Sequence, residues 1–166
     1  MAGIKREMQP EMNKRVRVLV VEDNQLARLI IQRRLTAEGY DVTLTASGRE
    51  AIALLRRESP DVILLDLMMP EMSGEETLCH IRQMGDATPI IIVSAAISRD
   101  TLLRLKGLGA DGFIAKPIDF TRLKEEIQRV IETSRQRLRG QVDEVLTLGD
   151  NEEQQVSEEL GDEPGT

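Results

Sequence analysis

Aromatic residues are almost absent from this sequence of 166 residues. It has no Trp, one Tyr and two Phe, so aromatic side chains make up 2% of the chain. Aliphatic side chains must therefore fill any hydrophobic core. With 40% apolar and 31% charged residues, the composition is that of a globular protein of about one domain.

Cysteine and histidine are equally scarce. Cys79 and His80 are the only residues of their kinds, which excludes an intramolecular disulfide and a zinc site built from Cys and His. We interpret Cys79 as a small buried filler. We interpret His80 as a partly exposed structural side chain rather than a phosphotransfer histidine.

Long apolar stretches are missing as well. No apolar run approaches the roughly 18 residues that a membrane-spanning helix needs. The first 14 residues are polar and lack the apolar stretch of a secretory signal. We therefore expect a cytoplasmic protein that does not associate with a membrane.

A strong field of one sign is also missing from most of the chain. Residues 1–139 hold all 22 Lys and Arg and 20 of the 29 Asp and Glu, a net charge of +2. Residues 140–166 hold nine acidic residues and no basic one. The acidity belongs to the tail, and we expect no direct binding to nucleic acid.

Five short apolar runs alternate with helical patterns. The runs span 16–21, 40–45, 61–66, 89–94 and 112–115. The first, third and fourth are almost continuously apolar, as expected of strands that are covered on both faces of a parallel sheet. Apolar residues recur every three or four positions in the segments between and after them, which predicts helices over 25–38, 48–58, 74–84, 98–108 and 120–139.

This alternation predicts an α/β fold, a doubly wound (βα)5 domain with a five-stranded parallel sheet over about residues 15–132. Ligands of such folds bind at the carboxyl ends of the strands. Five polar residues fall at or just beyond strand ends and are expected along one edge of the sheet: Glu22, Asp23, Asp66, Ser94 and Lys116.

The three carboxylates in this set indicate a cation site. Glu22, Asp23 and Asp66 would repel one another unless a cation joined them, and a cluster of oxygen ligands suits Mg²⁺. Asp66 is also a candidate nucleophile, because carboxylates form aspartyl-phosphate intermediates. Lys116 and Ser94 would supply a cation and a hydroxyl group to phosphoryl oxygens.

Plainer interpretations of the same residues stay open. Glu22 and Asp23 could cap the first helix, as acidic residues often do. Ser94 could cap a later helix, and Lys116 could be a surface lysine before a turn at Pro117.

Taken in order, the motifs resemble the receiver domain of bacterial response regulators. The resemblance covers about residues 15–132. It rests on VVEDN at 20–24, DLMMPEMSG at 66–74, SA at 94–95, GADGF at 109–113 and KP at 116–117. The second motif is the most specific, because an Asp ends a buried strand and Pro and Gly follow at fixed offsets.

The resemblance implies a single-domain protein like the chemotaxis regulators, with a flavodoxin-like strand order of 2-1-3-4-5 and a site that uses Mg²⁺. Glu22, Asp23, Asp66 and the backbone carbonyl of Met68 would hold the metal ion.

The resemblance also implies a role for each residue around the phosphoryl group. Asp66 would be phosphorylated, Ser94 would be the switch hydroxyl and Lys116 would contact the phosphate. Phe113 would be the aromatic switch, with an ordinary core residue as the alternative. The bond between Lys116 and Pro117 is expected to be cis.

The implied function is that of a phosphoacceptor. A sensor histidine kinase or phosphotransfer protein would phosphorylate Asp66, with contacts mainly on the first helix. The surface of the fourth helix, fifth strand and fifth helix would then change for protein–protein signalling to an output protein. We expect no enzyme activity on an external substrate. We expect the protein to be a monomer or a homodimer that phosphorylation promotes. Alternatively, the chain is the receiver portion of a larger regulator whose DNA-binding or catalytic output domain is missing.

Other classes of protein fit less well. A phosphohydrolase with an Asp nucleophile needs a second acid two residues later, where this chain has Met68. A dinucleotide-binding enzyme needs glycines after the first strand, where residues 22–25 read EDNQ. An interaction module that keeps the fold but is never phosphorylated stays open.

The two ends of the chain lie outside the resemblance. We expect a flexible leader over 1–14. The apolar spacing of the last helix continues past residue 132, so 133–149 is a helical extension or a linker. An extended helix would pair with a partner or a second copy. We expect an acidic disordered tail over 150–166.

Overall fold

Five parallel strands form one sheet in the order β2-β1-β3-β4-β5, as predicted. The computed structural model describes residues 14–95 and 97–159, with side chains as far as residue 145. The strands are β1 (Arg17–Val21), β2 (Asp41–Thr45), β3 (Val62–Asp66), β4 (Ile90–Ser94) and β5 (Gly112–Ala115).

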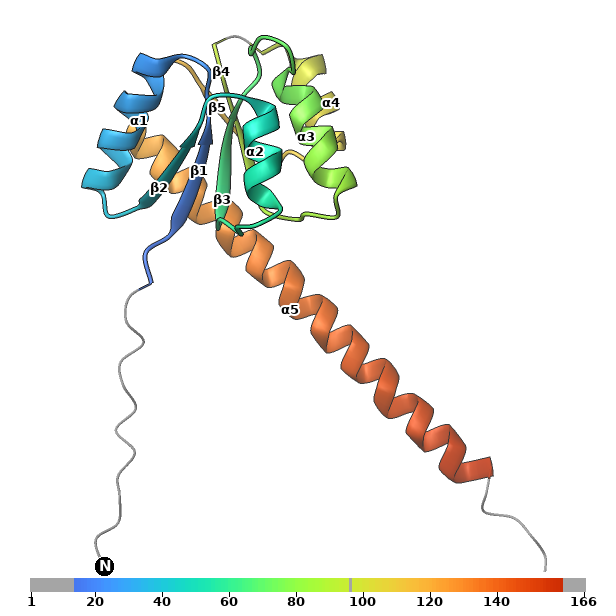
Figure 1. Cartoon of the computed structure of the whole chain (residues 1–166). Coiled ribbons are helices and arrows are strands. Elements are labelled where there is room, and N and C mark those ends of the chain that lie inside the picture. The colour runs from blue at the N-terminus through green and yellow to red at the C-terminus, as the bar shows by residue number, and fades with distance from the viewer. Residues whose placement is uncertain (1–13, 96, 160–166) are drawn as a thin grey trace, which may run out of the picture.

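The helices cover both faces of the sheet (Figure 1). They are α1 (Gln25–Ala37), α2 (Gly48–Leu55), α3 (Gly74–Gln83), α4 (Arg99–Gly107) and α5 (Phe120–Glu159). Each follows a strand, so the fold is the doubly wound (βα)5 arrangement that the sequence predicts.

Alternate residues of each central strand enter two separate cores. Val18 and Leu64 belong to the core beneath α1 and α5, whereas Leu19 and Ile63 belong to the core beneath α2, α3 and α4. Every residue of β3 and β4 is buried, which is why these strands read as continuous apolar runs. Buried polar residues at the ends of these strands are therefore held by a rigid framework.

Polar residues mark where the helices begin. Asn24, Ser47, Ser73 and Ser98 each accept a hydrogen bond from a backbone N–H in the first turn of a helix. Ser73 also forms a reciprocal capping box with Glu76. These caps place the first turns of α1, α3 and α4 close to the carboxyl edge of the sheet.

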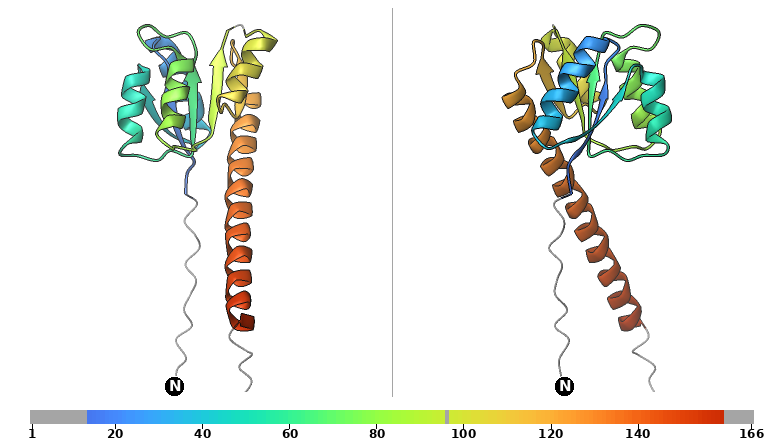
Figure 2. Two further views of the ribbon diagram at one scale, coloured as in Figure 1. Left: turned by 90° about the vertical axis from the view of Figure 1, so that its right-hand side faces the viewer. Right: turned by 60° about the vertical axis from the view of Figure 1, so that its left-hand side comes forward.

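The last helix extends far beyond the domain. It continues from Phe120 to Glu159 without a break at Gly140, and it projects away from the sheet in all views (Figures 1 and 2). The helical extension is therefore the correct alternative for 133–149. Residues 150–159 form the last part of α5, where the sequence predicts the start of an acidic disordered tail. A helix closes its own backbone hydrogen bonds without burial, and the many Glu and Gln residues favour it.

The remaining predicted end segments, 1–13 and 160–166, lie outside the described residues. Among the helices that the structure describes, none is both long enough and apolar enough to cross a membrane.

Candidate functional site

The carboxyl ends of β1, β3, β4 and β5 bring the predicted residues to one edge of the sheet. Glu22 and Asp23 follow β1, Asp66 ends β3, Ser94 ends β4 and Lys116 follows β5. Carboxylate oxygens of Glu22, Asp23 and Asp66 all lie within 4.8 Å of one another. The predicted acidic cluster is therefore present.

Two of the three carboxylates are buried. Glu22 is 3% exposed and Asp66 is 5% exposed, whereas Asp23 faces solvent. The ammonium group of Lys116 lies 2.8 Å from Glu22 Oε2 and 3.5 Å from Asp66 Oδ1. Lys116 is thus the cation of this site rather than a surface lysine, and it offsets part of the cost of burying two like charges.

The loop after β1 is held by its own hydrogen bonds. The Asn24 N–H donates to Glu22 Oε1 at 3.1 Å. The Arg28 guanidinium donates to the carbonyl oxygens of Glu22 and Asp23, both at 2.8 Å. Asn24 is the N-cap of α1, so Glu22 and Asp23 do not cap that helix. Arg28 was not predicted, because nothing in the local sequence distinguishes it from a solvent-exposed helix arginine.

The loop after β3 requires glycine at position 74. The Gly74 N–H donates to the Leu67 carbonyl at 2.9 Å. A Cβ atom there would lie 2.1 Å from the Asp66 carbonyl oxygen and 2.7 Å from the Leu67 Cα. The start of α3 can therefore approach the Asp66 backbone only without a side chain. The glycine of the 66–74 motif is the sequence signal for this contact.

The surroundings of Asp66 disfavour its charged form. Burial raises the pKa of Asp66 above the ordinary carboxyl range, and the negative charge of Glu22 raises it further. Lys116 and a 3.4 Å hydrogen bond from the Met68 N–H act in the opposite direction without cancelling the shift. Burial opposes the charge of Lys116, but its hydrogen bond to Glu22 and the charge of Asp66 outweigh burial and raise the pKa of Lys116.

The donor set fits a hard divalent cation. All three clustered side chains offer carboxylate oxygens, which are the ligands that Mg²⁺ prefers. Three carboxylates face one ammonium group, so the site has an excess of negative charge that a divalent cation would balance. Such an ion would also relieve the repulsion between Glu22 and Asp66.

Ser94, Phe113 and Lys116 line a shared hollow of about 580 Å³ between α4, β5 and α5. Ser94 is 2% exposed, and its carbonyl accepts a hydrogen bond from the Lys116 N–H at 2.9 Å. The N-cap of α4 is Ser98, so Ser94 is not a helix cap. Phe113 is half-buried and packs against the core beneath α4. The Lys116–Pro117 bond is cis, as expected.

Cys79 and His80 lie on α3, outside this cluster. His80 is exposed, in agreement with a structural side chain on the surface. The prediction that Cys79 is a buried filler is wrong, because its side chain is partly exposed. Leu78 and Ile81 fill the core at this point of α3 instead.

Comparison with protein-family models gives a match to the response regulator receiver domain over residues 18–128. Among similar proteins are the response regulator MprA of Mycolicibacterium vanbaalenii, 37% identical over 70% of this chain and 50% of the relative. The transcriptional regulatory protein ZraR of Salmonella typhimurium is 35% identical over 74% of this chain and 28% of the relative. The chain thus spans half or less of these relatives.

Solved structures match over almost their whole length. The Vibrio cholerae chemotaxis protein CheY4 is 33% identical with a TM-score of 0.67, covering 70% of this chain and 99% of that one. The signal receiver domain of a putative LuxO repressor protein from Vibrio parahaemolyticus is 35% identical with a TM-score of 0.70, covering 75% and 95%.

Proposed function

We propose that this chain, which belongs to the response regulator receiver family, accepts a phosphoryl group on Asp66 and passes the signal on by changing its surface. One observation carries the proposal. Asp66 ends a buried strand, with the carboxylates of Glu22 and Asp23 and the ammonium group of Lys116 around it. Receiver domains of this family work with histidine kinases, and a phosphohistidine is the donor we propose.

The chemistry is a transfer between a nitrogen and an oxygen. An ionised Asp66 oxygen forms a bond to phosphorus while the bond from phosphorus to the donor imidazole nitrogen breaks, and the nitrogen keeps the electron pair. Bound Mg²⁺ would supply positive charge to the phosphoryl oxygens. Its ligands would be Glu22, Asp23, Asp66 and the Met68 carbonyl.

The protein's own residues position the group. Lys116 Nζ lies 3.5 Å from Asp66 Oδ1, so the same ammonium group can pair with a phosphoryl oxygen attached there. The Ser94 hydroxyl would be a second donor. A phosphoryl group on Asp66 would bind Ser94 and Lys116 better in the active conformation than in the inactive one, so phosphorylation would shift the population toward the active conformation.

We propose that the output surface lies around the hollow that Ser94 and Phe113 line together. This hollow reaches Leu102 on α4 and Arg122 and Glu126 on α5. An inward movement of Ser94 would let Phe113 turn into the space beside it. The face formed by α4, β5 and α5 would then change shape for a downstream protein.

The donor would dock on α1 beside the site. Leu26, Leu29 and Ile30 are 67%, 44% and 48% exposed on this helix. A kinase or phosphotransfer protein would cover them while its phosphohistidine reaches Asp66.

Because the family is generally a non-catalytic signalling module, we propose no turnover of an external substrate. We place this exchange in the cytoplasm.

The test is the intact mass of the protein after incubation with Mg²⁺ and a small-molecule phosphodonor, beside Asp66→Asn. We expect the mass of one phosphoryl group to be gained with Mg²⁺, and no gain in the variant or in chelator. Equal gain in Asp66→Asn would place the phosphoryl group elsewhere. No gain from a small donor or from any histidine kinase, with Mg²⁺ binding intact, would favour an unphosphorylated interaction module.

A second candidate is that the receiver acts as one part of a longer regulator. The observation that favours it is the length of the relatives, which are about twice as long as the matched region or longer. The mass of the protein in its native cells distinguishes the two, because a longer regulator would exceed 18.6 kDa.

A further inference from the structure

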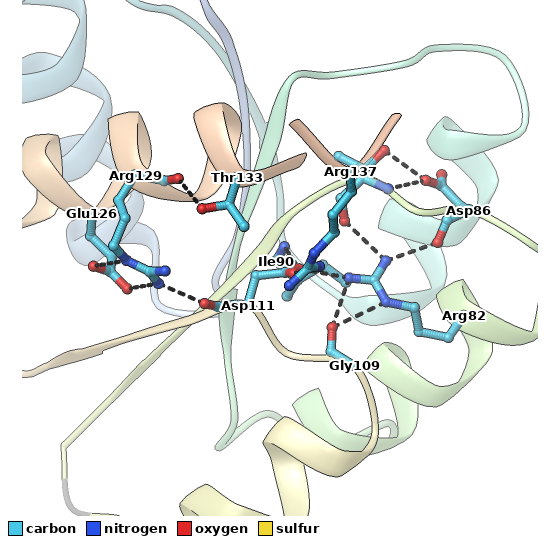
Figure 3. Close-up of polar contacts among 10 residues, drawn as sticks. Arg82, Asp86, Ile90, Gly109, Asp111, Glu126, Arg129, Thr133 and Arg137 are labelled. Carbon is cyan, nitrogen blue, oxygen red and sulfur yellow. Dashed lines mark hydrogen bonds and ion pairs between the residues drawn. The ribbon is translucent and has the colours of Figure 1, made fainter. Parts of the chain in front are cut away.

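The extension of α5 is fixed to the domain at its root (Figure 3). Arg129 donates to the Asp111 carbonyl at 2.7 Å, and Arg137 lies 3.3 Å from the Asp111 carboxylate. Arg82 of α3 and the Ile90 N–H of β4 hold the same carboxylate at 3.0 and 2.9 Å. Because Asp111 joins α5 to α3 and β4, the helix leaves the domain in a set direction and does not fold back onto it.

An apolar stripe continues along this projecting helix. Ile127, Ile131, Leu138, Val142 and Val145 follow one another at steps of four, seven, four and three, so they share one side of the helix. Ile127 and Ile131 are 0% and 8% exposed within the domain, whereas Leu138, Val142 and Val145 are 58%, 57% and 68% exposed. The domain therefore covers the first part of this stripe and leaves the part from Leu138 onward exposed, which is typical of an interaction surface.

The charges along the same helix are segregated. Residues 129–139 contain four Arg and one Glu, and residues 140–159 contain seven acidic residues and no basic one. Two such helices side by side in parallel would place acidic segment against acidic segment. In the antiparallel orientation the basic segment of each copy lies beside the acidic segment of the other.

We propose that the extension of α5 pairs in antiparallel orientation with the same extension of a second copy of this chain, through Leu138, Val142 and Val145. Centred near Val145, the pairing sets 135–139 of one copy opposite 151–155 of the other, over an overlap of about 30 Å at 1.5 Å per residue. The two domains lie at opposite ends of the pair. Their candidate phosphoacceptor sites stay free, because α5 leaves the domain at the edge opposite those sites (Figure 1).

This pairing goes beyond the proposed phosphoacceptor function and needs no phosphoryl group. Sedimentation of the unphosphorylated full chain should show a concentration-dependent dimer. Val142→Glu should raise the dimer dissociation constant at least tenfold, because it buries a charge in the apolar contact. The matched control Gln136→Glu adds the same charge at an exposed position on the other side of the helix, about 120° from Val142 and 160–180° from Leu138 and Val145, and should change the constant less than twofold. Arg135→Glu and high salt should also weaken the dimer.

The orientation is tested with one spin label per chain. Cys79→Ser removes the native thiol, and Gln128→Cys places a label on the exposed side of α5 near the domain. An antiparallel pair centred near Val145 sets the two labels about 50 Å apart along the helix, whereas a parallel pair sets them within about 20 Å. A short distance overturns the antiparallel arrangement. A monomer at all concentrations, or a Val142→Glu dimer as stable as the native one, overturns the pairing itself.

Discussion

At the scale of single residues, the site combines groups that are unfavourable by themselves. Glu22 and Asp66 are both buried and of like charge, and Lys116 is the cation that contacts both. Such a cluster is costly unless it is used. The excess negative charge suits this edge of the sheet to a divalent cation.

Asp66→Asn is expected to stabilise the metal-free protein at neutral pH. The pKa of Asp66 is raised in the folded state by burial and by Glu22, so the folded state binds this proton more tightly than the unfolded state. The wild-type protein therefore loses stability as pH rises from the ordinary carboxyl range through the raised pKa, and the variant does not.

The check is urea denaturation of both proteins in chelator from pH 4 to pH 8. The advantage of Asp66→Asn should shrink toward low pH, where the carboxyl is protonated. Added Mg²⁺ should stabilise the wild-type protein more than the variant. A variant that is less stable than wild type at pH 7 in chelator would contradict the prediction.

Gly74→Ala should damage both stability and the site. The added Cβ would meet the Asp66 carbonyl oxygen at 2.1 Å, so the backbone must shift at a cost of roughly 1–3 kcal/mol or more. Phosphoryl acceptance should fall with it, as measured by intact mass.

The matched control is Gly107→Ala in α4, where an added Cβ meets nothing within 4 Å. This variant should keep native stability and phosphoryl acceptance. Equal damage in both variants would show that the close approach at Gly74 is not the cause.

At the scale of elements, Arg82 connects segments that are distant in sequence. Its guanidinium donates to the carbonyl oxygens of Gly109, Asp86 and Thr88 and to the Asp111 carboxylate. These bonds join the end of α3 to the loops before β4 and β5. Half-buried and fully bonded, this arginine stabilises the edge of the sheet opposite the site.

Arg82→Met should therefore cost roughly 2–4 kcal/mol of unfolding free energy, since it leaves several acceptors and the Asp111 carboxylate unpaired. Chemical denaturation measures the loss. Arg104→Met is the control, because Arg104 pairs with Glu75 at a largely exposed position, where such pairs contribute little. A loss below about 1 kcal/mol for Arg82→Met would contradict this role.

Gly140→Ala should strengthen the helical extension without affecting the domain. Nothing lies within 4 Å of the added Cβ, and Ala favours a helix over Gly by about 1 kcal/mol. Amide exchange over 133–145 should slow, and the denaturation midpoint of the domain should stay unchanged. Unchanged exchange would mean that Gly140 does not limit the helix.

At the scale of the whole molecule, the chain is a domain with a projecting arm (Figure 2). The domain holds both apolar cores, whereas the side chains from Arg135 to Val145 are exposed. The projecting part of α5 therefore adds length and exposed surface to the molecule, but little stability to the domain.

Truncation after Arg139 should leave the unfolding free energy of the domain within about 0.5 kcal/mol of the full chain, because the contact from Arg137 to Asp111 is kept. The frictional ratio should fall, and the proposed dimer should be lost. Denaturation and sedimentation measure these outcomes. A large loss of stability would mean that the arm packs against the domain.

The sequence by itself determined the elements of the fold and the charged residues that gather at one edge of its sheet. Short, nearly continuous apolar runs and apolar patterns of period 3.6 are local consequences of buried strands and of helix geometry, so they predicted five strands, five helices and the doubly wound fold. The rule that ligands bind at the carboxyl ends of parallel strands was enough to group Glu22, Asp23, Asp66 and Lys116.

Only the tertiary structure decided how those groups are held. Lys116 pairs with Glu22 as well as Asp66, and Arg82 and Asp111 join distant loops. Both arrangements depend on contacts between segments far apart in sequence. The length of α5 is also seen only in the structure, where the helix continues to Glu159; from the sequence, acidic composition predicts disorder while local propensity favours helix. Composition alone does not decide between disorder and helix for this segment, whereas the structure shows a helix.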